Sequence, residues 1–448
     1  MGTLLKNAKI VNEGIIFSGH ILIENEIIAK IFKINDDITS FEKTIEIIDV
    51  KGNYLLPGLI DDQVHFREPG LTHKATIKSE SRAAVAGGIT SFMEMPNTVP
   101  NTLTQELLQD KYDIAEKTSY ANYSFYMGAS NDNIEEVLKT NPKTVCGVKV
   151  FMGSSTGNML VDNAETLEEL FSKCKLLIAA HCEDETTIRN NTTIYKEKYG
   201  EDIPVSCHPE IRSEEACYKS SAFAIQLAKK HNTRFHLFHL STAKEIELLE
   251  NKTPLKEKRI TAEACVHHLW FSDEDYKTKG NFIKWNPAIK KASDRDAILK
   301  GVIDGKIDII ATDHAPHTLE EKQQSYFKAP SGGPLVQHAL VALLELYHNH
   351  KISLEKIVEK TSHAVADCFH IENRGFIREG YFADLVIVDL NTPWTVEKSN
   401  ILYQCGWSPF EGTTFKSKVL YTFVNGTLVY HNGTFNENYR GKRLIFSI

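Results

Sequence analysis

The stretch LLPGLIDDQVHF, residues 55–66, is an apolar run that ends in polar residues. Seven further runs of this kind follow it: ITSFMEM, ANYSFYMG, CGVKVFM, KLLIAAHC, TRFHLFHLS, RITAEACVHH and KIDIIATDHAPH. Helical patterns lie between them, for example AETLEELFSK and TAKEIELLE. Apolar strands that alternate with amphipathic helices indicate a parallel α/β architecture. Eight such units over residues 56–370 predict a TIM (β/α)8 barrel.

The two ends of the chain differ from this middle segment, because both are rich in strand patterns. GHILIENEIIAKIF alternates polar and apolar residues around Glu24–Asn25–Glu26, which is a hairpin pattern. Near the other end, KVLYTFVNGTLVYHNGTF carries the turn pairs Asn425–Gly426 and Asn432–Gly433. We therefore expect residues 1–55 and 371–448 to form one small β-sandwich, with the barrel domain of residues 56–370 inserted between its halves.

Composition and charge narrow the classes of partner. The chain has 448 residues, 42% hydrophobic and 25% charged, which is the balance of an ordinary globular protein. A formal net charge of −8, without a basic block, argues against nucleic acid or an anionic membrane as the main partner. No apolar run approaches the ~20 residues of a membrane span, and the first residues lack a signal-peptide pattern. Eight scattered cysteines without a CxxC pair indicate reduced thiols, so we expect a cytoplasmic protein.

Metal-competent side chains gather at the ends of the barrel runs. They are Gln63 and His65 in run one, Lys149 in run four, His181 in run five, His239 in run six and Asp313 in run eight. In a barrel these strand ends converge on one mouth, where enzymes of this architecture place their sites. A single histidine at a strand end is commonly structural. Such residues on five strands of one barrel indicate a site for Zn²⁺ or a similar divalent ion.

These residue types suit hydrolysis at a metal centre. Two metal ions can share a bridging hydroxide, which is a strong nucleophile at neutral pH, and can polarise the attacked carbonyl. Asp313 could take the proton from that hydroxide and pass it to the leaving nitrogen. Lys149, costly to bury as a bare cation, becomes an anionic bridging ligand if CO₂ converts it to a carbamate.

Longer motifs around these positions resemble the dihydroorotases of the amidohydrolase superfamily. The motifs are PGLIDDQVHFREPG, MEMPNT, GVKVFMGSSTG, AAHCEDE, FHLFHLSTA, KWNPAIKKASDRDAI, ATDHAPH and CGWSPFEG. The resemblance runs from about residue 50 to the C-terminus. ATDHAPH is also typical of allantoinases and hydantoinases, whereas FREPG together with MPNT favours dihydroorotases. The resemblance implies reversible closure of N-carbamoyl-L-aspartate to dihydroorotate, with loss of water, in pyrimidine (UMP) biosynthesis.

The resemblance also implies a role for each matching residue. His65 matches a ligand of the first metal, and Asp313 matches a first-metal ligand that is also the catalytic acid/base. Lys149 matches the carbamylated lysine that bridges the metals, and the ligands of the second metal correspond to His181 and His239. The residues that hold the substrate carboxylate correspond to Arg67 and Asn97, and further substrate contacts correspond to Asn286 and His317. An arginine suits this task, because a planar guanidinium binds a carboxylate through two parallel hydrogen bonds. The number of ions, one or two Zn²⁺, stays open at this point. The resemblance further implies a homodimer.

One position departs from the family pattern. The family has His-x-His at the end of run one, and this chain has Gln63-Val64-His65. We expect a loosened first-metal site, in which Gln63 offers its weaker carbonyl oxygen or leaves the position to water. Two alternatives stay open: a non-catalytic partner subunit, for example of aspartate transcarbamoylase, and a related cyclic amidase such as a hydantoinase or allantoinase. The substrates of those amidases lack the ring carboxylate, so Arg67 and Asn97 argue against them.

Other polar residues have structural interpretations that compete with functional ones. His267 and His268 are expected on opposite faces of a strand as structural groups, and His314 as a packing or supporting residue. His208 could order a loop near the mouth, and Glu183 could orient His181. The polar segment 318–334, which holds Gly332–Gly333, is either an ordinary surface loop or a lid that offers backbone donors to the substrate.

Overall fold

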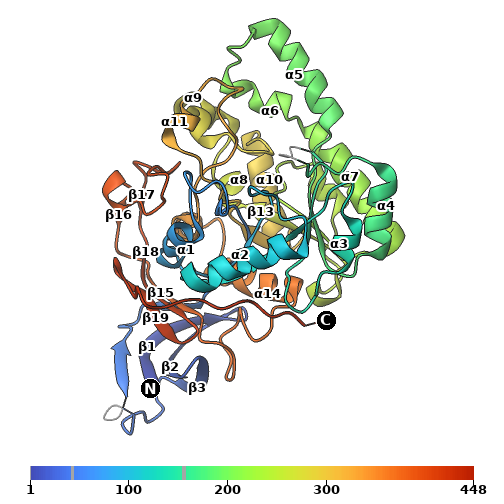
Figure 1. Ribbon diagram of the computed structural model, residues 1–448. Helices are drawn as coiled ribbons and strands as arrows, with labels where there is room; N and C mark the ends of the chain where they lie inside the picture. The colour runs from blue at the N-terminus through green and yellow to red at the C-terminus, as the bar shows by residue number, and fades with distance from the viewer. Residues whose placement is uncertain (1, 42–44, 154–157, 448) are drawn as a thin grey trace.

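The computed structural model describes residues 2–41, 45–153 and 158–447. Its middle segment is a ring of parallel strands surrounded by helices (Figure 1). The ring strands are β6 (Leu59–Val64), β7 (Ile89–Glu94), β8 (Asn122–Phe125), β9 (Met127–Gly128), β10 (Val148–Phe151), β11 (Ile178–His181), β12 (Phe235–Leu237), β13 (Ile260–Cys265) and β14 (Ile309–Ala311). Each of the eight apolar runs therefore forms one barrel position, with β8 and β9 sharing the third.

Two junctions close the ring. β8 and β9 follow each other on either side of Tyr126, whose backbone N–H donates to the Glu94 carbonyl at 3.0 Å. On the other side, a parallel bridge joins Val64, the last residue of β6, to His314 after β14. The backbone N–H of His65 donates to the His314 carbonyl at 2.7 Å. These bonds hold the end of β6 beside the end of β14, so the first and last runs meet at the mouth.

Helices pack around the ring, as the amphipathic patterns between the runs predict. They are α1 (Ile77–Ala86), α2 (Gln105–Thr118), α3 (Ile134–Leu138), α4 (Ala164–Lys173), α5 (Glu185–Tyr199), α6 (His208–Ile211), α7 (Glu214–His231), α8 (Val266–Trp270), α9 (Tyr276–Lys279), α10 (Ala292–Ile303), α11 (Leu319–Lys322), α12 (Ala339–His348), α13 (Leu354–Val358) and α14 (Ala364–Phe369). Among the described residues, every helix is too short or too polar to cross a bilayer.

The prediction of a helix at residues 242–250 is wrong. Residues 242–250 contain only a four-residue 3₁₀ turn, Glu245–Leu248. The Glu245 side chain is buried, and its carboxylate accepts hydrogen bonds from Ser221 Oγ at 2.6 Å and Thr242 Oγ1 at 2.8 Å. Side-chain bonds of this kind compete with helical backbone bonds, and here they hold the segment as a tight turn.

Both termini contribute to one mixed sheet, which lies against the end of the barrel away from α5, α6 and α11 (Figure 1). Its order is β20-β19-β18-β15-β5-β1-β2-β3, and β4 pairs with β1. The bounds are β1 (Gly2–Asn12), β2 (Ile15–Glu24), β3 (Ile27–Lys33), β4 (Glu46–Asp49), β5 (Tyr54–Pro57), β15 (Leu385–Asp389), β18 (Lys418–Val424), β19 (Thr427–His431) and β20 (Thr434–Phe435). A separate pair is formed by β16 (Trp394–Thr395) and β17 (Thr414–Phe415). The predicted fold class is confirmed.

The turns of this sheet fall where the sequence predicts them. Asn25 lies between β2 and β3 with φ 56°, and Asn425 lies between β18 and β19 with φ 47°. Asparagine tolerates this left-handed conformation better than most side chains, which is why it marks such hairpins. The boundaries at residues 55–56 and 370–371 stay a prediction.

A buried polar network joins the terminal sheet to the barrel. Asn425 Nδ2 donates to Asn122 Oδ1 at 2.7 Å, and Asn122 Nδ2 lies 3.3 Å from Asp384 Oδ2. Arg374 donates to the same Asp384 carboxylate. Thr422 Oγ1 donates to the Val85 carbonyl of α1 at 2.7 Å. Because buried polar groups are costly when unpaired, these bonds fix the position of the sheet against β8 and α1.

Candidate active site

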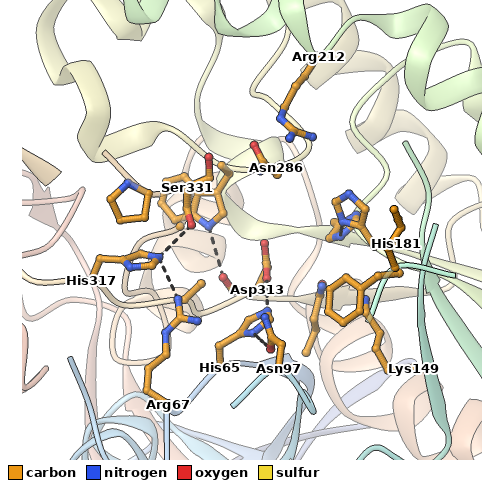
Figure 2. Close-up of a pocket in the computed structure, with 18 of the residues that line it drawn as sticks. His65, Arg67, Asn97, Lys149, His181, Arg212, Asn286, Asp313, His317 and Ser331 are labelled. Carbon is orange, nitrogen blue, oxygen red and sulfur yellow. Dashed lines mark hydrogen bonds and ion pairs between the residues drawn. The ribbon is translucent and has the colours of Figure 1, made fainter. Parts of the chain in front are cut away.

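A cavity of about 570 Å³ opens at the C-terminal ends of the barrel strands. The residues that line it include Gln63, His65, Arg67, Asn97, Lys149, His181, His239, Asn286, Asp313 and His317. The structure therefore brings all ten of the predicted site residues to one cavity. Figure 2 shows Arg67 and His317 on one side of it, Lys149 and His181 on the other, and Asp313 between them.

His65 and Asp313 lie side by side at the centre of the cavity. His65 Nε2 is 3.2 Å from Asp313 Oδ1, and His65 Nδ1 is 2.8 Å from Asn97 Oδ1. Since the amide oxygen can only accept, Nδ1 carries the proton and the Nε2 lone pair faces Asp313. Burial lowers the pKa of His65 well below its ordinary value, which keeps the ring neutral. Burial raises the pKa of Asp313 to about 7, against the opposing charge of Lys149.

His181 and His239 form a second pair of facing rings. His181 Nδ1 lies 2.9 Å from His239 Nε2, and His181 Nε2 lies 2.8 Å from Glu183 Oε2. A proton on Nε2 that is donated to Glu183 leaves the Nδ1 lone pair directed into the cavity. Burial lowers the pKa of both histidines, so neutral imidazoles face each other. Two neutral imidazole nitrogens at this separation suit a shared metal ion.

Lys149 is buried at the base of the cavity between aromatic rings. Its Nζ lies 4.0 Å from the centre of the Phe238 ring and 4.6 Å from that of Phe151. The residue is 1% exposed, and burial lowers the pKa of its amine to about 7. A large fraction of the amine is therefore neutral near pH 7, which is the form that reacts with CO₂.

Gln63 lies in the cavity with its amide oxygen directed to a thiol. Cys265 Sγ is 3.5 Å from Gln63 Oε1 and is placed to donate a weak hydrogen bond to it. The imidazole and carboxylate donors of His65, Asp313, His181 and His239 fit a divalent ion. Gln63 adds a single neutral oxygen that is already shared with Cys265. The donor set is thus stronger on the His181–His239 side.

The opposite wall of the cavity is cationic. Arg67 Nε donates to the Pro316 carbonyl at 3.0 Å, and one terminal nitrogen lies 3.0 Å from His317 Nε2. Arg67 makes no ion pair within the described ranges 2–41, 45–153 and 158–447, although it is only 7% exposed. Burial lowers its pKa to about 10, so the guanidinium stays charged at neutral pH. A buried charge without an acidic partner suits an anionic ligand.

Comparison with known proteins agrees with this geometry. Residues 54–429 match the model of the amidohydrolase family. The chain belongs to the amidohydrolase family. Among amidohydrolase relatives, a dihydroorotase of Methanosphaera stadtmanae is 33% identical over 95% of this chain and 96% of that protein. A dihydroorotase of Enterococcus faecalis is 32% identical over 96% of this chain and 99% of that protein. In three dimensions, the L-hydantoinase of Arthrobacter aurescens is similar with a TM-score of 0.90 at 25% identity, over 97% of each chain.

Arg212 is a cavity residue of this amidohydrolase that the sequence analysis missed. It lies between α6 and α7 and points over the mouth beside Asn286 (Figure 2). Its guanidinium pairs with Glu183, the carboxylate that holds His181. Burial alone would raise the pKa of Glu183, but Arg212 and His181 outweigh it and lower that pKa to about 2. The HPEIRSEEA segment has no strand or metal-ligand spacing, so no pattern marked this arginine.

The segment 318–334 supplies backbone to the cavity. Pro330, Ser331 and Gly332 line it, and Lys322 holds them in place by donating from Nζ to the Pro330 carbonyl at 2.9 Å and the Gly332 carbonyl at 2.8 Å. Gly332 has φ 126°, and a Cβ there would lie 2.5 Å from the Ala315 carbonyl oxygen. Only glycine fits this approach. Residues 154–157 of GVKVFMGSSTG lie outside the described residues.

The four other histidines that the sequence analysis singled out are supporting groups. His267 and His268 lie on helix α8, not on a strand as expected, because β13 ends at Cys265. His267 stacks on Trp285 with ring centres 4.4 Å apart. His314 is bound by Glu80 at 2.9 Å and points away from the cavity. His208 binds Tyr326 Oη at 2.8 Å and the Trp285 carbonyl at 2.7 Å, and so orders the loops beside the mouth.

Proposed function

We propose that this amidohydrolase is a dihydroorotase, which interconverts dihydroorotate and N-carbamoyl-L-aspartate in pyrimidine (UMP) biosynthesis. The observation that carries the proposal is the buried Arg67, a cation that makes no ion pair among the described residues, across the cavity from His181 (Figure 2). Dihydroorotate carries a ring carboxylate close to the amide that is cleaved, and a guanidinium binds a carboxylate in a fixed orientation. The dihydroorotases among the relatives, at 31–33% identity, support the same substrate.

The related hydantoinases give a second candidate substrate class, which the cationic wall disfavours. Hydantoins and dihydropyrimidines present a neutral ring without a carboxylate. In that case the Arg67 guanidinium would stay buried and unpaired when substrate binds, which is costly. The pair of Arg67 and His317 therefore selects the acidic ring.

The metal ligands in this proposal are His65, Lys149, His181, His239 and Asp313, with Gln63 as a weak additional oxygen. One or two divalent ions, with Zn²⁺ as the first choice, would supply an activated water and polarise the attacked carbonyl. The neutral amine of Lys149 would react with CO₂ and release one proton to water, which gives a carbamate that can serve as an anionic ligand. Asn97 holds the His65 ring through Nδ1, so it also fixes the direction of the Nε2 lone pair.

The other residues bind the substrate and move the proton. Arg67 and the Nδ2 group of Asn97 hold the ring carboxylate, and His317 and Asn286 contact polar atoms of the ring. Asp313 takes the proton of the attacking water and delivers it to the ring nitrogen as the C–N bond breaks. A carboxylate in contact with both the attacking water and the ring nitrogen can accept this proton and release it again. Ring closure is the reverse sequence, in which water leaves.

Location and assembly follow from the same proposal. We place the enzyme in the cytoplasm as a homodimer, with aspartate transcarbamoylase as an additional partner. Gln63 is the observation that favours a second candidate function, a non-catalytic subunit of such a complex, because it removes an imidazole from the cavity. Light scattering of the purified chain, alone and mixed with aspartate transcarbamoylase, measures both associations.

Ring opening of dihydroorotate by the purified chain tests the function. Activity that is lost on chelation and returns with Zn²⁺ is the expected result. Hydantoin, dihydrouracil and allantoin serve as comparison substrates, and a preference for any of them would overturn the assignment. A folded protein that turns over none of the four rings at any metal loading would favour the non-catalytic subunit.

A further inference from the structure

Three buried side chains form a cluster inside the barrel, deeper than the mouth cavity. Asp62 lies on β6, His236 on β12 and Glu263 on β13. One ligand atom from each lies within 4.8 Å of the other two, and all three residues are 0% exposed. None of them lines the mouth cavity. β6 is not a neighbour of β12 or β13 in the ring, so these side chains meet across the barrel interior.

The His236 ring lies between Thr261 and the two carboxylates of the cluster. His236 Nδ1 lies 2.8 Å from Thr261 Oγ1, and that hydroxyl is placed to donate to the Phe235 carbonyl at 3.4 Å. Thr261 Oγ1 also lies 3.2 Å from Cys368 Sγ. A proton on Nδ1 that is donated to Thr261 leaves the Nε2 lone pair free for a ligand, whereas a proton on Nε2 would be donated to the carboxylates. Nε2 lies 3.4 Å from Asp62 Oδ2 and 3.4 Å from Glu263 Oε2.

Asp62 is the least satisfied member of the cluster. Neither of its carboxylate oxygens has a hydrogen-bond donor within the described parts of the chain. Glu263 is better held, because its Oε1 accepts the backbone N–H of His239 at 3.0 Å. In that same part of the chain, no lysine or arginine forms an ion pair with either carboxylate. Two carboxylates in a sealed interior are costly unless a positive charge or a shared proton neutralises them.

We propose that Asp62, His236 and Glu263 bind a divalent cation, as a site separate from the one in the mouth. Two carboxylates balance the charge of the ion, and the neutral imidazole completes a set of one nitrogen and at least two oxygens. This donor set suits Zn²⁺ or Mn²⁺. The ion ties β6 to β12 and β13 and stabilises the floor of the mouth. Through Glu263 it also holds the backbone of His239, and Asp62 is the direct neighbour of Gln63.

The competing state is a single proton shared by the two carboxylates. Burial raises the pKa of Asp62 well above its ordinary value and that of Glu263 to about 8, so the empty cluster would hold a proton near neutral pH. The ion and the proton neutralise the same charge, and they differ in what a metal measurement finds. Metal binding by the cluster does not depend on which ring the enzyme opens. A negative result in the substrate assays would therefore leave this proposal standing, and a negative metal result would leave the proposed function standing.

Metal analysis of the full chain, saturated with Zn²⁺ and then freed of excess, tests the proposal. Asp62→Asn and Glu263→Gln should each lower the bound zinc by about one ion per chain, because each removes a charged ligand. Asp61→Asn is the matched control, since Asp61 is a buried carboxylate on the same strand that binds Thr312 and no histidine. His181→Ala should lower the amount of zinc bound in the mouth cavity and leave the ion at Asp62, His236 and Glu263 in place.

Anomalous diffraction at the zinc edge locates the ion without any substitution. A peak among Asp62, His236 and Glu263 in crystals of the unmodified protein is the expected result, and it should vanish in Asp62→Asn. An unchanged zinc count in both variants would overturn the proposal. So would a zinc-loaded crystal with a peak in the mouth and none at the cluster, which leaves the shared proton. If the variants fail to fold, the diffraction of the unmodified protein still decides.

Discussion

Arg67→Met is the substitution that most directly tests how the cavity recognises its substrate. Methionine keeps most of the length of the side chain and removes the charge. The change costs the protein one hydrogen bond to the Pro316 carbonyl and the contact with His317. It leaves His65, Lys149 and the His181–His239 pair in place, so the metal donors should be unaffected.

The expected loss can be worked from the hydrogen bonds that a carboxylate would make. Arg67 can offer two N–H groups to it, and each charge-assisted bond contributes ~1.5–3 kcal/mol. A total of roughly 3–6 kcal/mol corresponds to a fall in kcat/KM of about 10²- to 10⁴-fold at ~1.4 kcal/mol per tenfold. Because the carboxylate is bound before and during ring opening, most of this loss should appear as a higher KM.

Steady-state kinetics of dihydroorotate ring opening measure the effect. Arg67→Lys is the matched control, since it keeps the charge but not the planar fork, and it should recover part of the lost affinity. Circular dichroism and zinc content confirm that the fold and the metal site remain. An unchanged KM in a folded, metal-loaded Arg67→Met protein would refute the carboxylate clamp. A fall in kcat alone would instead assign Arg67 to the chemical step.

Four further changes test other parts of the site. Asp313→Ala should lower kcat by at least about 10³-fold while circular dichroism stays unchanged, because both a metal ligand and the acid/base are lost, and an active variant would remove Asp313 from that role. Gln63→His should bind zinc more tightly in a competition titration with a chelator, because an imidazole replaces an amide oxygen, and unchanged affinity would show that position 63 is not a ligand. The pKa of Glu183 is lowered from 4.5 to about 2, so its pairing with Arg212 stabilises the fold above pH 4.5, and this stabilisation is lost as the pH falls towards 2. In Glu183→Gln, the stability measured by fluorescence during acid unfolding should therefore fall less steeply between pH 4.5 and 2. Identical acid-unfolding curves for the two proteins would contradict this linkage. Lys322→Met should lower the thermal midpoint by several degrees and raise KM, because carbonyl groups of the 318–334 segment lose their donor, and a normal KM would make this segment structural only.

The barrel could be predicted because its strands are short apolar runs that end in polar residues. His65, His181 and Asp313 come from runs far apart in the sequence, and parallel strands in a closed ring bring their C-terminal ends together. The composite sheet was predicted for a similar reason, since Asn25 and Asn425 mark tight hairpins at both ends of the chain. In each case a local pattern coincided with the long-range arrangement.

Other features depended on tertiary contacts that leave no local pattern. The helix expected at 242–250 is a short turn because Glu245 bonds to Ser221, a residue on α7. Arg212 enters the cavity from a connection whose sequence resembles any polar loop. Asp62 and Glu263 look like ordinary strand residues, and only the closed barrel brings them together from opposite sides of its interior.

The mouth and the deeper cluster are linked through the backbone that they share. Glu263 holds the N–H of His239, whose φ of 37° is unusual for a residue with a side chain, and that bond helps to keep the His239 ring facing His181. Asp62 immediately precedes Gln63, whose amide oxygen lies 3.5 Å from Cys265 Sγ. The cluster is therefore in direct contact with the backbone of His239 and adjacent in sequence to Gln63. An ion at Asp62 and Glu263 would stiffen the backbone beside Gln63, the residue that we propose as a weak metal ligand.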